Sequence, residues 1–274
     1  MSRRRLAALS ATATGLLTER TVTSVRRALE ANLGEADRWR RQNYRGREVS
    51  LLLGPATAAG GVLGVALAAR GSRPAAVLAV ASAAGVGLYD DLYGDRHAKG
   101  LTGHARALRE GRVTTGMVKL VALATSAATA SAIRYRDPVD IALGTVLIAG
   151  GANLANLFDL RPGRAAKVTS IAAVLLTRAD TRETRAVAAV AAGAAAAALP
   201  VDLSEQAMLG DCGAGTLGAL LGWAAGGSGS RRRRVALAVA VVGLTAVSER
   251  VSFSAVIADH PVLRRLDQFG RQSA

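Results

Sequence analysis

The apolar stretch PAAVLAVASAAGVGLY, residues 74–89, is followed at once by two aspartates, Asp90 and Asp91. A long run without a charged side chain is typical of a helix in contact with lipid. A charge at membrane depth costs about 2.5–3.5 kcal/mol even on lenient insertion scales, so carboxylates there are rarely without a role. The combination predicts a membrane helix whose end carries part of a binding or catalytic site.

Similar apolar stretches recur along the rest of the chain, and 50% of all residues are hydrophobic. Stretches such as Ala186 to Leu199 have no polar face, which argues against a soluble bundle of amphipathic helices. We therefore expect an all-α, polytopic membrane helix bundle with about eight transmembrane helices. The expected spans are 52–70, 74–89, 114–133, 138–157, 165–177, 184–200, 207–224 and 234–257. Several are shorter than the roughly 20 residues that cross a bilayer, so some must extend into polar flanks or be re-entrant.

The first fifty residues differ from the rest and are expected to form a basic, amphipathic segment (1–50) ahead of the membrane domain (51–274). Leu6 to Leu17 follows three arginines, which resembles the start of a signal peptide or half of a first membrane helix. The basic stretch from Val22 to Arg47 is suited to lying on anionic lipid. The single cysteine, Cys212, excludes a disulfide within the chain.

The net charge of +15 is interpreted as a topology signal, so no nucleic-acid partner is expected. With eight spans and both ends in the cytoplasm, most lysines and arginines fall in cytoplasmic segments, as the positive-inside rule requires. The run Arg231 to Arg234 is an exception, because it would lie outside. Either it faces anionic head groups, or the segment 207–224 dips into the membrane and returns. The expected location is the plasma membrane.

Two more acidic residues, Asp159 and Asp211, also stand at expected helix ends, and in this topology they share the cytoplasmic side with Asp90 and Asp91. Gly210 and Gly213 flank Asp211, which allows a diphosphate to approach the free N–H groups of a helix start. Magnesium prefers one or two carboxylates together with substrate phosphates, so this stretch suits a nucleotide diphosphate held by a metal ion. The alternative is that these small residues only allow close helix packing.

Basic residues surround the acidic pair. Lys119 lies one turn inside the next expected span, where it could neutralise phosphate charge in a transition state. Between the two spans, Lys99 and His104 belong to a basic segment and are candidate substrate contacts. The arginines of that segment are more often determinants of topology than ligands.

Taken in order, four motifs resemble the polyprenyl-phosphate N-acetylhexosamine-1-phosphate transferases, or glycosyltransferase family 4, which includes the phospho-N-acetylmuramoyl-pentapeptide transferases. They are Asp90-Asp91, Lys99-Gly100-Leu101 followed by Lys119, Asn156-Leu157-Phe158-Asp159 and Gly210-Asp211-Cys212-Gly213. The resemblance covers residues 40–270. It implies Mg2+-dependent transfer of a sugar-1-phosphate from a UDP-sugar to a polyprenyl phosphate at the cytoplasmic membrane face, for synthesis of cell-envelope glycans.

The resemblance also implies roles for individual residues. Asp211 would hold the metal, Asp90 or Asp91 would act as base or phosphate-side acid, and Lys119 would contact a phosphate. Asn156 and Asp159 would form part of the nucleotide-sugar pocket. Where the family continues with a second aspartate, this chain has Leu160-Arg161-Pro162-Gly163-Arg164, which makes Arg161 and Arg164 candidate contacts for an anionic substrate.

Two other classes of function stay open at this point. One is a non-catalytic descendant that keeps the fold and binds a lipid or an envelope partner, which the missing aspartate and the lack of a histidine cluster near the C-terminus favour. The other is a small transporter, in which intramembrane acids would carry protons or cations. The clustering of acids at helix ends argues against transport. Membrane lipid is the expected environment in every case, and association into a homodimer stays open.

Overall fold

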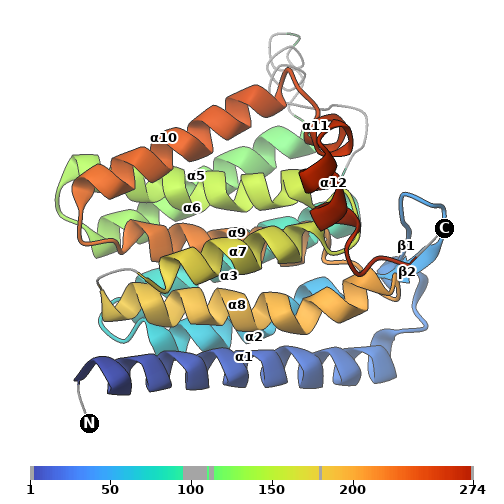
Figure 1. Cartoon of the computed structure of the whole chain (residues 1–274), viewed down its shortest axis with the longest axis horizontal. Helices are drawn as coiled ribbons and strands as arrows, with labels where there is room; N and C mark the ends of the chain where they lie inside the picture. Colours follow the sequence, from blue (N-terminus) through green and yellow to red (C-terminus); the bar gives the residue numbers. More distant parts are fainter. Residues whose placement is uncertain (1–2, 95–109, 111–113, 179–180, 273–274) are drawn as a thin grey trace.

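Long helices lying side by side make up nearly all of the structure, a computed structural model that describes residues 3–94, 110, 114–178 and 181–272 (Figure 1). A two-stranded antiparallel hairpin is the sheet present in these residues. The elements are α1 (Arg3–Leu33), the 3-10 turn η1 (Asp37–Trp39), β1 (Arg40–Gln42), β2 (Glu48–Ser50), α2 (Leu53–Ala68), α3 (Arg73–Tyr93), α5 (Thr115–Arg134), α6 (Pro138–Phe158), α7 (Arg164–Leu176), α8 (Arg182–Leu203), α9 (Gly210–Gly226), α10 (Arg231–Ser248), α11 (Phe253–Asp259) and α12 (Pro261–Gln268).

Four of the described helices are long and apolar enough to cross a membrane: α3, α5, α6 and α8. The number rises to five if α10 and α11, which are bent by 91° at their junction, count as one broken span. The all-α membrane-like bundle is therefore confirmed, but the expected eight spans are not supported. The apolar run 165–177 became α7, whose 13 residues extend only about 20 Å against a hydrocarbon core of about 30 Å. The run from residue 52 became α2, which has 16 residues.

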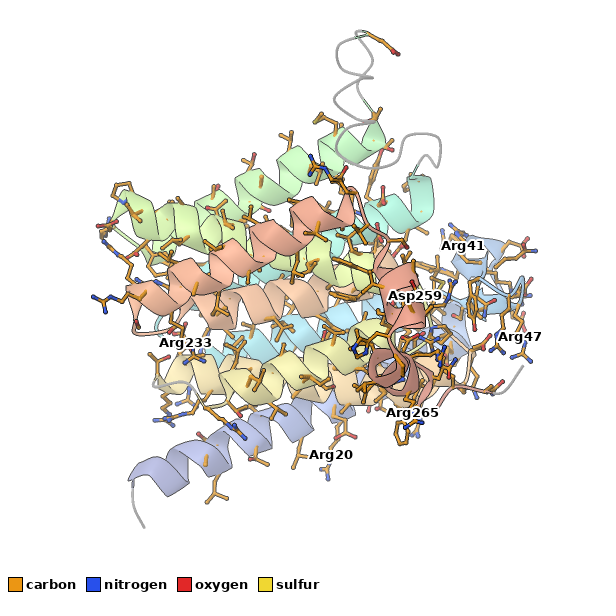
Figure 2. All side chains as sticks on the ribbon, turned by 45° about the horizontal axis from the view of Figure 1, so that its top comes forward. Arg20, Arg41, Arg47, Arg233, Asp259 and Arg265 are labelled. Carbon is orange, nitrogen blue, oxygen red and sulfur yellow. The ribbon has the colours of Figure 1, made fainter. Side chains whose placement is uncertain are left out.

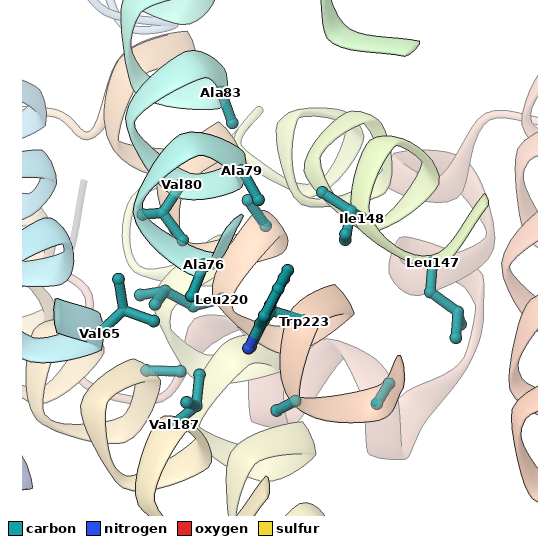
Figure 3. Packing of buried hydrophobic residues seen from close by; sticks show 14 of the residues in the cluster. Val65, Ala76, Ala79, Val80, Ala83, Leu147, Ile148, Val187, Leu220 and Trp223 are labelled. Atoms are coloured by element: carbon teal, nitrogen blue, oxygen red, sulfur yellow. The ribbon is translucent and has the colours of Figure 1, made fainter. Parts of the chain in front are cut away.

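Helix α9 occupies the centre of the bundle and explains why counting apolar runs gave too many spans. Its 17 residues are almost all buried against protein, including Trp223. Figure 3 shows Trp223 among side chains from neighbouring helices, such as Val80 of α3, Ile148 of α6 and Val187 of α8. A helix that is apolar all round can be a membrane span or the core of a large bundle. The sequence pattern of the two is the same.

Glycine sets the spacing between α9 and its neighbours. A Cβ added at Gly218 would collide with the backbone of Gly151 in α6, and one at Gly87 of α3 would collide with the backbone of Asp211. Small residues let helix backbones approach closely, and the resulting contacts are a main source of helix association in membranes. The same contacts hold the end of α3 against the start of α9.

The N-terminal segment is part of the bundle. Helix α1 packs along α8 and α2, and Val22 is buried, although the sequence places it at the start of a stretch suited to lipid. The chain then turns into the β1–β2 hairpin, which lies at the end of the bundle where α3 and α6 finish (Figure 1). A single bridge joins Ser50 of β2 to Ala207, in the loop between α8 and α9.

The arginine run at the start of α10 lies at the opposite end of the bundle, where two acids neutralise part of its charge. Arg231 pairs with Asp137 and Asp140 at 3.0 Å each, and Arg234 pairs with Asp140 at 2.8 Å. Figure 2 shows Arg233 at this end, far from Arg41 and Arg47 of the hairpin. Two of the four arginines thus have acidic partners within the protein. The sequence alone suggested anionic head groups or a re-entrant segment for this run, and neither explanation included such ion pairs.

Candidate functional site

The two aspartates at the end of α3 have different surroundings. The Asp91 carboxylate accepts hydrogen bonds from the backbone N–H groups of Asp211 and Cys212, both at 2.9 Å. It therefore satisfies free N–H groups at the start of α9, where the helix dipole favours a negative charge. Gly210 just before them has φ +59° and a Cβ there would stand 2.8 Å from both Asp91 oxygens. Glycine is needed at this position for conformation and for space.

Asp90 instead meets Lys119, which reaches in from the second turn of α5. The Lys119 ammonium is 2.9 Å from Asp90 Oδ2 and also forms an ion pair with the Asp211 carboxylate. The three side chains are between 18% and 29% exposed. Three helices therefore contribute one charged side chain each to a single cluster, Asp90–Lys119–Asp211. An ion pair network that is partly open to solvent leaves its charges available to a ligand.

A polar cavity of about 390 Å3 opens beside this cluster, which is large enough for part of a small-molecule ligand. It is lined by Arg41, Gln42, Leu51, Asp90, Asp91, Leu92, Gly94, Met208 and Asp211. Arg41 belongs to β1, and its Nη2 donates to the backbone carbonyl of Asp91 at 2.7 Å. The cavity is thus lined by three carboxylates and one guanidinium. Figure 2 shows Arg41 on the hairpin side of the molecule.

A second cavity of about 280 Å3 lies on the other side of Gln42 and Met208, which line both. Asp159, the residue that ends α6, lines it together with Arg161, Asp202 and Glu205. Burial raises the pKa of Asp159 well above its usual range, and the nearby negative charges of Asp202, Asp211 and Asp91 raise it further. A hydrogen bond with the Gly210 backbone acts in the opposite direction. Asp159 thus lies near the start of α9, as Asp91 does.

The remaining expected site residues differ in whether they are free to contact a ligand. Asn156 is one turn before Asp159, and its Oδ1 atom is buried and has no hydrogen-bond partner in the described structure. Arg161 stacks over the ring of Tyr44 at 4.4 Å and lines the second cavity. Arg164 is only 5% exposed and is bound to Asp267, so its charge is used within the protein. Lys99 and His104 lie outside the described residues.

The expected residues Asp90, Asp91, Lys119, Asp159 and Asp211 are therefore brought to one end of the bundle. Sequence reasoning missed Arg41 and Glu205. Glu205 has φ +54° and a side chain that is 1% exposed, and it accepts a 2.6 Å hydrogen bond from Asn43 and pairs with Arg45 at 3.3 Å. It fixes the hairpin over the second cavity. The available sequence signal for Glu205 was its position close to Asp202. Nothing in the sequence pattern linked Glu205 to its partners Asn43 and Arg45, about 160 positions earlier.

Two of these carboxylates are arranged in a way that suits a divalent cation. Asp90 and Asp211 contact one ammonium group and both line the larger cavity, so two carboxylate oxygens point to one place. Such a pair suits Mg2+, which takes one or two carboxylates and completes its shell with phosphates and water. Within the described ranges, no group of three or more His, Cys, Asp or Glu side chains could hold a metal ion without other ligands.

No protein-family model matches the chain, and no curated protein matches it.

Proposed function

We propose that the protein transfers a sugar-1-phosphate from a UDP-sugar to a polyprenyl phosphate at the cytoplasmic face of the plasma membrane. The observation that carries the proposal is the cluster Asp90–Lys119–Asp211. It joins three of the motifs that resemble the transferase family, although 92 positions separate Lys119 from Asp211 in the sequence. The remaining motif of the family gives a fourth acid, Asp159, which ends α6 and forms a hydrogen bond with the backbone of Gly210 at the start of α9.

The reaction requires charge neutralisation and positioning more than covalent chemistry by the protein. An oxygen of the lipid phosphate forms a new bond to the sugar-bearing phosphorus, and the bond from that phosphorus to the bridging oxygen of UMP breaks. Lys119 would donate to phosphate oxygens, a role supported by the contact of its ammonium with two carboxylates that line the polar cavity. Arg41, which lines the cavity, would add a second positive charge.

The two carboxylates of the cluster would hold Mg2+, and the ion would supply further neutralisation of the diphosphate. Asp90 is the better candidate for a catalytic carboxylate than Asp91, because both Asp91 oxygens already accept backbone hydrogen bonds. Arg161 is the candidate for an anion contact in the second cavity. Arg164 is a poorer one, since Asp267 neutralises it.

The direct test is exchange of labelled UMP with a panel of UDP-sugars by the purified protein in detergent, with polyprenyl phosphate and Mg2+ present. Asp211→Asn keeps the shape of the side chain but removes its charge, and we expect turnover to fall by about a hundredfold or more. Asp137→Asn is the matched control, because Asp137 is an ion-paired aspartate at the other end of the bundle. It should exchange UMP at the rate of the unmodified protein.

Two results would contradict the proposal. One is near-normal exchange by Asp211→Asn, which would remove Asp211 from the site. The other is the absence of exchange with every UDP-sugar by a protein that unfolds cooperatively in detergent, which would favour a non-catalytic binding role. Omission of Mg2+ in parallel separates the metal requirement from the assignment of Asp211.

A further inference from the structure

The end of the chain carries an apolar surface that the proposed transfer reaction does not use. Helix α12 exposes Val262, Leu263, Leu266 and Phe269, and Phe269 is 77% exposed. On a helix with 3.6 residues per turn these positions fall on one face. Arg264 and Arg265 are also exposed and lie outside that face. A short helix with an apolar side and a basic side is the usual form of a segment that lies in the membrane interface.

The polar edge of α12 is fixed to the bundle. Arg164 at the start of α7 binds both oxygens of Asp267, at 2.7 and 3.1 Å, and Arg271 binds the same carboxylate at 2.6 Å. The Lys167 ammonium donates to the backbone carbonyls of Leu266, Asp267 and Phe269. These contacts are stabilising at a helix C-terminus, where carbonyl groups are free. Because the helix is held by this edge, its apolar face is turned away from the protein.

Exposed apolar side chains are also found on the helices that precede α12. Exposed large apolar side chains run along the last spans of the chain, namely Val235, Val239, Val242, Leu244, Val247, Val251 and Val256, before those of α12. The chain bends by 91° between α10 and α11, and Figure 1 shows α11 and α12 crossing the end of the bundle instead of following its length. A helix that leaves a membrane span at a right angle runs parallel to the membrane plane.

We infer that α12 lies in the membrane–water interface, with its apolar face among the acyl chains and its arginines beside anionic lipid head groups. Lipid is favoured over a protein partner because the preceding helices α10 and α11 also expose large apolar side chains, as lipid-facing helices do, and because Arg264 and Arg265 complement negative phosphates. Figure 2 places Arg265 at the same end of the molecule as Arg41 and Arg47. The inference does not depend on the proposed reaction, since it requires only that the bundle spans a membrane.

Cysteine labelling provides the test, because the only native cysteine, Cys212, is buried. Leu266→Cys carries an environment-sensitive fluorophore on the apolar face, and Arg264→Cys carries it on the basic side as the matched control. Each protein is reconstituted into phosphatidylcholine vesicles with or without about one quarter phosphatidylglycerol. We expect lipid-attached quenchers to remove several-fold more emission at 266 than at 264, with iodide in the water giving the reverse order.

The charge contribution is tested on the Leu266→Cys background with Arg264→Gln and Arg265→Gln added. Quenching from the lipid should increase with phosphatidylglycerol in the parent, and this increase should be lost in the double variant. Quenching of 266 by iodide alone would place the face in water and overturn the inference. Protection of 266 from both quenchers would mean that protein covers the face, for example a second copy of the chain, and would also overturn it. Quenching that is equal with and without phosphatidylglycerol would overturn the role of the arginines.

Discussion

Two neighbouring aspartates with the same chemistry have separable roles, and a pair of single substitutions can show this. Asp91→Asn weakens the cap on α9, because an amide offers one acceptor where the carboxylate used two oxygens. We predict a loss of about 0.5–2 kcal/mol in stability, the range for helix caps. Asp90→Asn keeps the cap and disturbs the contact with Lys119. We therefore expect it to lower turnover more than Asp91→Asn does, and to lower stability less. Thermal unfolding in detergent and UMP exchange measure the two effects. A larger loss of stability in Asp90→Asn, together with a larger loss of turnover in Asp91→Asn, would contradict this assignment of roles.

Asp159 gives a prediction about pH. Burial raises its pKa well above the ordinary value of 3.8, so its ionisation opposes folding. This penalty is absent below the unfolded-state pKa and grows as the pH rises toward the raised folded-state pKa. Asp159→Asn removes the ionisable group, and we expect it to unfold at a higher temperature than the parent at pH 7. The gain should vanish near pH 4. A gain that is the same at both pH values would mean that charge is not its cause.

At the scale of helices, close approach at glycine is the feature most easily tested. Gly218→Val should destabilise the bundle by about 1–3 kcal/mol, the usual range for overpacking, because the Gly151 backbone occupies the space. Gly85 of α3 is the matched control, since a Cβ there would meet nothing within 4 Å. Gly85→Ala should be neutral or stabilise by about 0.5–1 kcal/mol, because alanine is the better helix former. Equal destabilisation by both variants would exclude close packing as the reason.

The helices themselves could be predicted well from the sequence, but their relation to the membrane could not. Each expected span from 52–70 to 234–257 contains a helix, because apolar runs bounded by Gly, Pro and charge are informative about local structure. An apolar run is equally compatible with lipid contact and with burial, so α7 and α9 were counted as spans. The break between α10 and α11 was missed, because the run 234–257 contains no proline.

The whole molecule makes one prediction about topology, which follows from the site residues lying at one end of the bundle. Cysteines at Leu160 and Arg45 should be shielded from an impermeant thiol reagent in intact cells, whereas one at Arg136, at the opposite end, should react. The buried Cys212 leaves little background. The positive-inside rule predicts this orientation. Labelling at 160 and 45 with protection at 136 would place the site on the outer face and contradict a cytoplasmic reaction.

The candidate site was predictable only in part, because a sequence identifies charged residues but not the contacts between them. Charged residues at membrane depth stand out in any sequence, so Asp90, Lys119, Asp159 and Asp211 could be identified singly. Their mutual contacts depend on how helices pack, as does the difference between Asp90 and Asp91. Arg41 could not be singled out, because the basic N-terminal segment contains many arginines and only the hairpin brings this one to the cavity. Arg164 is close to Arg161 in the sequence and was an equal candidate for an anion contact. In the structure Arg164 is paired with Asp267.

The bridge that Lys119 forms between Asp90 and Asp211 has a consequence for biosynthesis. Asp90 and Lys119 belong to α3 and α5, which leave the ribosome well before α9. At about 5–20 residues per second, the 92 residues from Lys119 to Asp211 take roughly 5–20 s to synthesise. Because Lys119 pairs with Asp90 in the folded protein, these two opposite charges can compensate each other while both helices enter the bilayer. The later arrival of α9 completes the cluster, and the nascent chain therefore acquires its site only after most of its membrane segments have been inserted.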